Sequence, residues 1–354
     1  MMEHETTPRS ALDLDGLMRL LRPTSADGRG VAGLIGLCLA LILLFSVLMP
    51  GQFLTLGTFQ SMLFQLPELG LLALAMVVPL ISGGINLSII ATTNQCALLM
   101  AFIMTHGITP ESSGGTIALV IAAALIAGFL HCLAVGLFTG FLVANMGVHP
   151  ILVTLGTMSL VDGISIYLTR GTVIAGFPDA FQWIGNGVVG GIPVPFLIFI
   201  AVVLVVATIL QRTPFGIAVF MVGSNAEATR YSGIDTKRVF IGIYVMSALL
   251  CFVAACLMMA RFNSASAGYA QSYLLITILA AVLGGVDPFG GFGRIAGLVT
   301  ALIVLQIISS GLNQLGLSLH VTLAIWGLTL ILVMAFRSAW RSWTGKRASR
   351  RRIP

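Results

Sequence analysis

Residues 117–146 read IALVIAAALIAGFLHCLAVGLFTGFLVANM and contain no Asp, Glu, Lys or Arg. A helix rises about 1.5 Å per residue, so this run is longer than the ~30 Å hydrocarbon core of a bilayer requires. The run lacks the strict alternation of a barrel strand and therefore predicts a membrane-spanning helix. Its length indicates that the helix is strongly tilted or broken.

The whole chain is as poor in charge as this run. Of its 354 residues, 58% are hydrophobic and only 8% are charged, whereas a soluble domain has about 25% charged residues. So few charges cannot cover a water-facing surface. The solvent that suits such a chain is a bilayer, in which every backbone polar group is paired internally. We therefore predict an all-α polytopic membrane protein.

Long apolar runs recur along the chain, and they predict about ten transmembrane helices. The predicted spans are 31–49, 62–82, 88–105, 117–146, 149–169, 193–211, 239–260, 271–286, 295–315 and 319–336. The eighth is short enough to be re-entrant. The segments outside them are a cytoplasmic N-terminal segment 1–30 and a basic tail 337–354, which flank a transmembrane domain 31–336.

Positive charge is clustered and orients the chain. Of 18 Lys and Arg, four precede residue 30, four lie in 211–240 and seven in 337–354. The positive-inside rule places these segments, and both termini, in the cytoplasm. External connections then hold only Arg170 and Arg261. This pattern fits membrane orientation and argues against a nucleic-acid partner, and the tail is expected to contact anionic lipid.

The cytoplasmic loop 212–238 carries the signals of a short helix. Ser224 and Glu227 match the S-x-x-E capping box, which predicts a helix starting near Asn225. Gly233 is its expected stop, and Asp235 follows as the expected cap of the next span. Such a helix favours a docking surface over the alternative, an interfacial helix with its charges in water.

Two glycine-rich stretches interrupt the apolar background, and they read ISGGINLS at 81–88 and LGGVDPFGGFG at 283–293. Paired glycines destabilise a helix by about 1 kcal/mol each relative to alanine, and broken helices often line the substrate path of transporters. A tight cytoplasmic turn is the alternative. The Gly284-Gly285-Val286-Asp287 sequence echoes Gly83-Gly84-Ile85-Asn86, which suggests an internal two-fold repeat.

These motifs carry a resemblance to a known family. GGINLS at 83–88, HPILVTLGT at 149–157, GSNAEA at 223–228 with SGI at 232–234, and the glycines of 283–293 occur in a characteristic order and spacing. Together they resemble the ribose-type permease family of bacterial ABC importers, which includes permeases for other simple sugars and for autoinducer-2. The resemblance covers residues 57–336.

The resemblance implies a multi-pass protein of the bacterial inner membrane. Its expected partners are a second permease subunit, identical or related, a pair of ABC ATPase subunits that bind ATP and Mg²⁺, and a periplasmic solute-binding protein. The helix at 224–233 would be the coupling helix that inserts into the ATPase. The residues implied in coupling are Gly223, Ser224, Asn225, Glu227, Arg230 and Gly233, with Glu227 and Arg230 as contacts and the two glycines setting the ends.

Two residues depart from the family pattern. Asn86 stands where the family usually has aspartate, and Asp287 stands where it usually has a small polar residue. Our hypothesis is that both turns face a shared cytoplasmic vestibule and that the acidic charge has moved across it. Gly83, Gly84, Gly284 and Gly285 are then candidates for gating beside these two side chains.

Glu68 and Asp162 are the acidic residues that lie well inside predicted spans. A charge at mid-bilayer costs at least about 2.5 kcal/mol, so each is expected to face protein or water. Glu68, next to Pro67, either binds a sugar hydroxyl or satisfies backbone groups. Asp162 either lines the path or pairs with Arg170. For Glu68 as well, structural pairing is the alternative to a role in the permeation path.

Two other functions compete with the importer. An ion-coupled secondary transporter would use Glu68 and Asp162, and would leave the capped cytoplasmic helix without a role. An intramembrane enzyme lacks support, because the chain has no G-x-S-x-G, H-E-x-x-H or paired YD and GxGD motifs. The chain also has no P-loop, so ATP hydrolysis is expected in a separate subunit, with no cofactor in this one.

Overall fold

The structure is a computed structural model that describes residues 28–318, 320–332 and 335. The expectations for most of the N-terminal segment and for the basic tail 337–354 lie outside these residues. Within them the chain is a bundle of helices with four two-residue strands. The predicted all-α polytopic class is confirmed.

Eight described helices are long and apolar enough to cross a membrane. They are α2 (Gly28–Leu48), α3 (Leu56–Ile81), α4 (Ile89–Gly107), α5 (Gly114–Met146), α6 (Pro150–Thr169), α8 (Val194–Arg212), α11 (Thr236–Phe262) and α13 (Ile295–Gln314). Each coincides with a predicted span. The other two predicted spans are shorter apolar helices, α12 (Tyr273–Leu283) and the helix at His320–Leu332.

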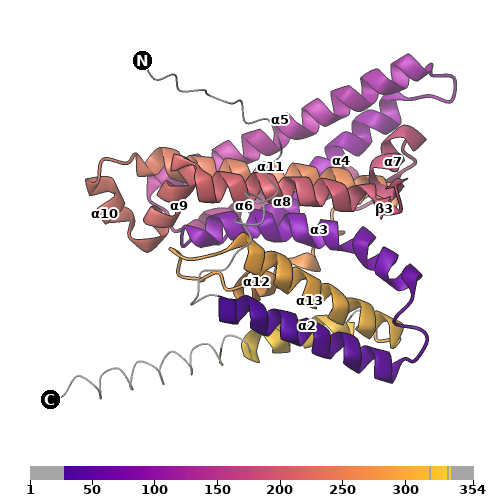
Figure 1. Cartoon of the computed structure of the whole chain (residues 1–354). Helices are drawn as coiled ribbons and strands as arrows, with labels where there is room; N and C mark the ends of the chain where they lie inside the picture. The colour runs from indigo at the N-terminus through magenta and orange to yellow at the C-terminus, as the bar shows by residue number, and fades with distance from the viewer. Residues whose placement is uncertain (1–27, 319, 333–334, 336–354) are drawn as a thin grey trace, which may run out of the picture.

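Short elements gather at the two ends of the bundle (Figure 1). At one end are α7 (Asp179–Asn186) and two antiparallel pairs, β1 (Ile174–Ala175) with β4 (Ser264–Ala265) and β2 (Val188–Val189) with β3 (Ile192–Pro193). At the opposite end are α9 (Pro214–Ser224) and α10 (Ala226–Tyr231). The charge distribution predicts that the α10 end is cytoplasmic.

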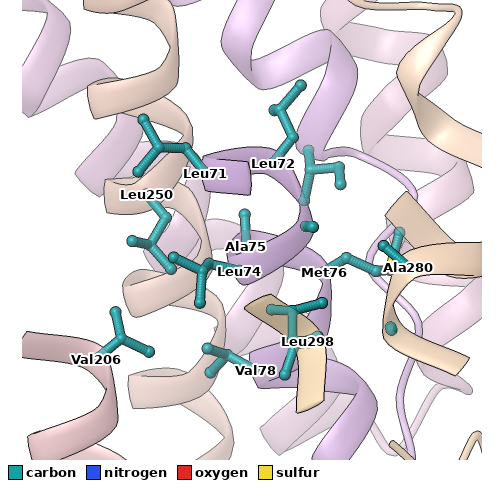
Figure 2. Packing of buried hydrophobic residues seen from close by; sticks show 14 of the residues in the cluster. Leu71, Leu72, Leu74, Ala75, Met76, Val78, Val206, Leu250, Ala280 and Leu298 are labelled. Atoms are coloured by element: carbon teal, nitrogen blue, oxygen red, sulfur yellow. The ribbon is translucent and has the colours of Figure 1, made fainter. Parts of the chain in front are cut away.

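Helix α3 lies at the centre of the bundle. Every residue from Leu66 to Ile81 is buried, and α11, α12, α8 and α13 pack around it. A helix that is apolar on all sides is stable only when all its sides are covered. Figure 2 shows its side chains packed against residues of these neighbours, among them Val206, Leu250, Ala280 and Leu298.

Helix α5 is a single unbroken helix of 33 residues that runs obliquely to its neighbours (Figure 1), so its extra length is accommodated by tilt. Its GxxxG pair, Gly136 and Gly140, faces α11. A Cβ on Gly136 would lie 2.9 Å from the Cα of Val245, and one on Gly140 would lie 2.8 Å from the Cα of Ile241. Small residues therefore permit the closest helix approach here.

Helix α12 is a half-helix, as the short eighth span predicts. Its 11 residues extend about 16 Å, which is too short to cross a bilayer. The non-helical segment before it enters the bundle beside α4. The Nδ2 of Asn94 donates to the carbonyl of Ala267 at 2.6 Å, and the N–H of Ala270 donates to the Oδ1 of Asn94 at 3.1 Å. This buried amide satisfies the backbone groups that irregular structure exposes in a membrane.

Candidate functional site

Helix α10 has the predicted position but a different cap. Its N-cap is Asn225, whose Oδ1 accepts a hydrogen bond from the N–H of Ala228 at 2.9 Å. Ser224 is the last residue of α9, and its helical backbone cannot serve as an N-cap. The predicted capping box is therefore wrong, although the predicted helix start is correct. Gly233, with φ +84°, ends the helix as expected, and Asp235 caps α11.

The side chains of α10 are exposed except for Thr229. Glu227 and Arg230 face solvent, and Tyr231 is 85% exposed. A hollow of about 310 Å³ lies between α9 and α10. An exposed, capped helix beside a hollow suits the docking interpretation, and the roles of Glu227 and Arg230 in coupling stay predictions.

Asn225→Ala is expected to loosen α10, whereas Ser224→Ala is expected to have little effect. Loss of an N-cap costs about 1 kcal/mol, which corresponds to a roughly fivefold rise in local opening. Hydrogen exchange of the α10 amides measures this change. Equal protection in the two variants would contradict the assignment of Asn225 as the cap.

Three segments meet at one backbone contact next to α10, which we call the glycine junction and define by Ile81, Gly83, Gly223, Gly290 and Gly291. The N–H of Gly291 donates to the carbonyl of Ile81 at 2.8 Å. A Cβ on Gly223 would overlap that carbonyl and lie 2.5 Å from the nitrogen of Gly291. A Cβ on Gly290 would lie 2.6 Å from the nitrogen of Gly83. The ends of α3 and α9 and the α12–α13 loop therefore touch through their backbones.

The ends of α3 and α12 share one backbone geometry. In each, a left-handed glycine follows the C-cap, Gly83 with φ +82° and Gly285 with φ +88°. In each, the N–H of the next residue donates to the carbonyl five residues earlier at 3.0 Å, which is the Schellman motif. Gly83 is thus equivalent to Gly285 and not to Gly284. The proposed equivalence of Asn86 with Asp287 is wrong by one residue, because the helix ends set the register.

Asn86 is buried against α11 and does not face a vestibule. Its Nδ2 donates to the Oγ of Ser247 at 2.9 Å, and its Oδ1 accepts from the N–H and Oγ of Ser88 at 3.1 and 2.7 Å. Ser247 in turn donates to the carbonyl of Ala75 at 2.7 Å. The side chain is 3% exposed. The hypothesis of a charge moved across a vestibule therefore fails at Asn86, which holds the segment after α3 onto α11.

Asp287 shapes the α12–α13 loop. Its N–H donates to the carbonyl of Phe292 at 2.9 Å, and its Oδ1 accepts from the N–H of Phe289 at 3.2 Å. Gly284 lies where α12 meets α13, since a Cβ there would be 2.7 Å from the nitrogen of Leu298. Gly84 is packed closely against α11, because a Cβ added to it would lie 3.0 Å from the Tyr244 hydroxyl.

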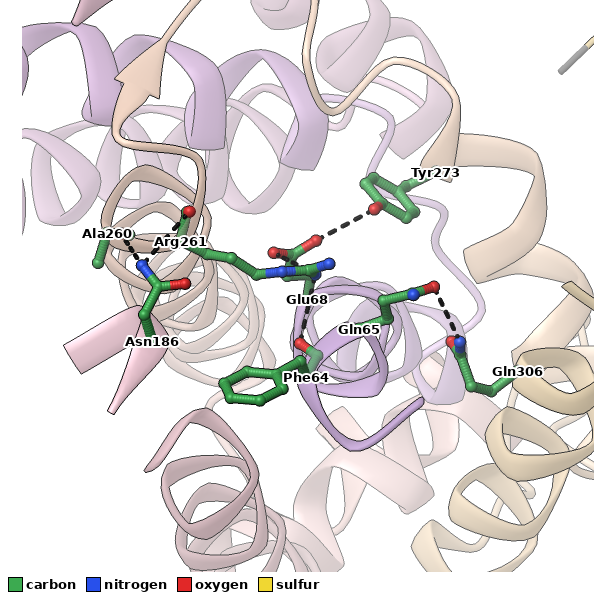
Figure 3. Close-up of polar contacts among 8 residues, drawn as sticks. All are labelled: Phe64, Gln65, Glu68, Asn186, Ala260, Arg261, Tyr273 and Gln306. Carbon is green, nitrogen blue, oxygen red and sulfur yellow. Dashed lines mark hydrogen bonds and ion pairs between the residues drawn. The ribbon is translucent and has the colours of Figure 1, made fainter. Parts of the chain in front are cut away.

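Glu68 is paired inside the bundle (Figure 3). Its Oε1 lies 2.9 Å from the Nη1 of Arg261, and its Oε2 accepts a hydrogen bond from the Tyr273 hydroxyl at 3.2 Å. Its side chain is 2% exposed. Arg261 also donates to the carbonyl of Phe64 at 3.3 Å, and Asn186 of α7 donates to the carbonyl of Ala260 at 3.0 Å. Of the two interpretations of Glu68, structural pairing agrees with this geometry.

Asp162 does not form the predicted pair with Arg170. Helix α6 ends at Thr169, and Arg170 is its exposed left-handed C-cap with φ +52°. Eight residues of helix also separate the two by about 12 Å along the axis. The Oδ1 of Asp162 is buried without a hydrogen-bond partner among the described residues.

Sequence reasoning missed the partners of Glu68. Arg261 was expected in an external connection, but it lies in the last turn of α11. Tyr273 gave no signal, because one tyrosine at the start of an apolar run is unremarkable by itself. Gln65 was missed as well. It accepts a hydrogen bond from the Nε2 of Gln306 at 3.2 Å (Figure 3), and the seven-residue spacing of Thr58 and Gln65 on one face of α3 would have indicated it.

The sequence profile of the family described as branched-chain amino acid transport system / permease component matches residues 58–334. The chain is 33% identical over 276 residues to the autoinducer 2 import system permease protein LsrD of Yersinia enterocolitica, covering 76% of this chain and 80% of that one. It is 30% identical over 334 residues to the ribose import permease protein RbsC of Bacillus subtilis, covering 94% and 97%. No solved structure matches.

Proposed function

Because this chain belongs to the family of branched-chain amino acid transport system permease components, we propose that it is the membrane-spanning subunit of an ATP-driven ABC importer for a simple sugar or sugar-like solute. The names of two relatives, one for autoinducer 2 import and one for ribose import, support this solute class over the amino acids in the family description. The observation that carries the proposal is α10, an exposed and capped helix at the cytoplasmic end of an apolar bundle.

The proposal includes partners. A pair of ABC ATPase subunits binds ATP and Mg²⁺ and docks at α10, a second permease subunit completes the membrane part, and a solute-binding protein delivers solute from the periplasm. The location is the inner membrane of a bacterium. This chain supplies the path and the gating and performs no catalysis itself.

The glycine junction gives this proposal a mechanical route. Gly223 lies three residues before the start of α10 and contacts the Ile81 carbonyl at the end of α3. The same carbonyl accepts from Gly291 in the α12–α13 loop. Backbone contacts of this kind do not relax by side-chain rotation. A displacement of α10 by the ATPase therefore reaches the central helix and the half-helix α12 together.

The ion-coupled alternative has less support. Family membership favours the importer, and the carboxylate of Glu68 is held by Arg261 and Tyr273. A carboxylate that binds and releases a coupling ion in each cycle would have to leave these partners.

Glu227→Arg is expected to abolish recovery of an ABC ATPase when the tagged protein is purified in mild detergent and its partners are identified by mass spectrometry. The reversed charge repels a basic partner and disturbs the exposed face of α10. Glu111→Arg is the matched control, since Glu111 is exposed in the connection between α4 and α5 at the other end of the bundle. ATPase recovery with wild type and both variants would move the contact away from Glu227. No ATPase with wild type, in cells that express one, would refute the proposed function.

A further inference from the structure

A polar hollow opens at the outer ends of α3 and α13. It has a volume of about 280 Å³, near the lower limit of ligand pockets. Its lining includes Thr58, Ser61 and Gln65 of α3 and Ser310, Asn313 and Gln314 of α13. The remaining two lining residues, the N-cap of α3 and a glycine, also lack charge. In a chain that is 58% hydrophobic, no apolar side chain lines this hollow among the described residues.

The lining is built by two helix faces turned toward each other. Thr58, Ser61, Gln65 and Glu68 recur at spacings of three and four residues, which places them on one side of α3. The Nε2 of Gln314 donates to the Thr58 hydroxyl at 2.9 Å. Two turns deeper, the Nε2 of Gln306 lies 3.2 Å from both the Gln65 Oε1 and the Ser310 Oγ.

The hollow closes inward and opens outward. Ser310 and Gln306 are buried and Gln65 is half-buried at its inner end, whereas Ser61, Asn313 and Gln314 are exposed. Below Gln65, one helical turn along α3, lies Glu68 with its Arg261 and Tyr273 partners. A solute entering from outside would therefore meet amides and hydroxyls, and the buried Glu68–Arg261 pair lies beyond the closed inner end.

The chemistry of this lining selects a class of solute. Hydroxyl and amide side chains both donate and accept hydrogen bonds, so they match a solute rich in hydroxyl groups. A zwitterionic amino acid would instead leave its two charges without counter-charges, which is costly away from bulk water. We propose that this hollow is the outer binding station for an uncharged polyhydroxyl solute in the permease path. This inference rests on the proposed function and adds to it the site and the kind of solute.

Cysteine protection tests the site in intact cells that express the full importer. The Ser61→Cys variant is expected to react with a membrane-impermeant maleimide, and D-ribose at high concentration is expected to slow the reaction while L-leucine does not. Uncharged hydroxyls and amides impose little selection among sugars, so D-ribose serves as the probe for the class. Leu56→Cys, at a position 90% exposed at the start of the same helix, is expected to react equally with and without either solute. Equal labelling of the Ser61→Cys variant with and without D-ribose would overturn the site.

A matched pair of substitutions tests its use in transport. Gln65→Leu is expected to lower D-ribose uptake by roughly tenfold, the effect of losing about one hydrogen bond to solute. Gln60→Leu makes the same change on an exposed side of α3 outside the hollow and is expected to leave uptake unchanged. Equal uptake in the two variants would contradict the station.

The two proposals fail in different ways. ATPase recovery with the Gln65→Leu protein is expected to equal that of wild type, because α10 lies at the opposite end of the bundle. Loss of uptake in Gln65→Leu, without protection of the thiol in the Ser61→Cys variant, would assign the hollow to contact with another protein and refute the solute site. Protection of that thiol in a protein that recovers no ATPase would keep the site and refute the ATP-driven importer.

Discussion

Arg261→Met is expected to lower the free energy of unfolding by roughly 3 kcal/mol, at the low end of the cost of breaking a buried ion pair. Among the described residues, the substitution leaves the Glu68 carboxylate, 2% exposed, with only the Tyr273 hydroxyl as its hydrogen-bonding partner. The estimate is at the low end because Arg261 is itself 22% exposed. Denaturation of the purified protein in detergent measures the loss.

The matched control is Arg238→Met. Arg238 pairs with Asp235 at 3.0 Å on the surface, where the two side chains are 87% and 53% exposed, and exposed ion pairs contribute little. The double variant Glu68→Gln with Arg261→Met removes both charges and is expected to recover most of the lost stability. If Arg261→Met were no less stable than Arg238→Met, the ion pair would not be a support of the fold.

Gly223→Ala is expected to lower solute uptake at least tenfold. Its Cβ would overlap the Ile81 carbonyl and lie 2.5 Å from the nitrogen of Gly291. Both neighbours are backbone atoms of separate segments, so neither moves aside by rotating a side chain. Overpacking costs about 1–3 kcal/mol. Here the overlap is relieved by moving apart the three segments that join α10 to α3. Uptake in cells and the melting temperature of the purified protein are the measurements.

Gly156→Ala is the control for this substitution. Gly156 lies within α6, and a Cβ there has nothing within 4 Å. Alanine stabilises an open helical position by about 0.5–1 kcal/mol relative to glycine, so this variant is expected to melt no lower than wild type. If Gly223→Ala behaved like Gly156→Ala in uptake and melting, the glycine junction would have no role in coupling.

Family motifs predicted the importer before any geometry was available, but they did not predict the internal partners of polar residues. Asn86 was expected in a vestibule because its motif departs from the family pattern, and it is instead held by Ser247 and Ser88. The capping-box pattern selected Ser224 over Asn225 because the pattern carries no information on how far α9 extends. In both cases the local sequence correctly predicted a break between helices. It assigned the wrong role to the side chain, a place in a vestibule for Asn86 and the N-cap for Ser224.

The sequence by itself determined the membrane class, the predicted orientation, the approximate positions of the long helices and the end of α10. These follow from hydrophobicity, from the positions of Lys and Arg, and from glycines such as Gly233, which act on the chain within a few residues. Only the tertiary structure decided that Glu68 meets Arg261, that Gly223 contacts Ile81, and that polar faces of α3 and α13 enclose a hollow. Those contacts join segments far apart in the chain, and the packing of whole helices fixes which side chains meet.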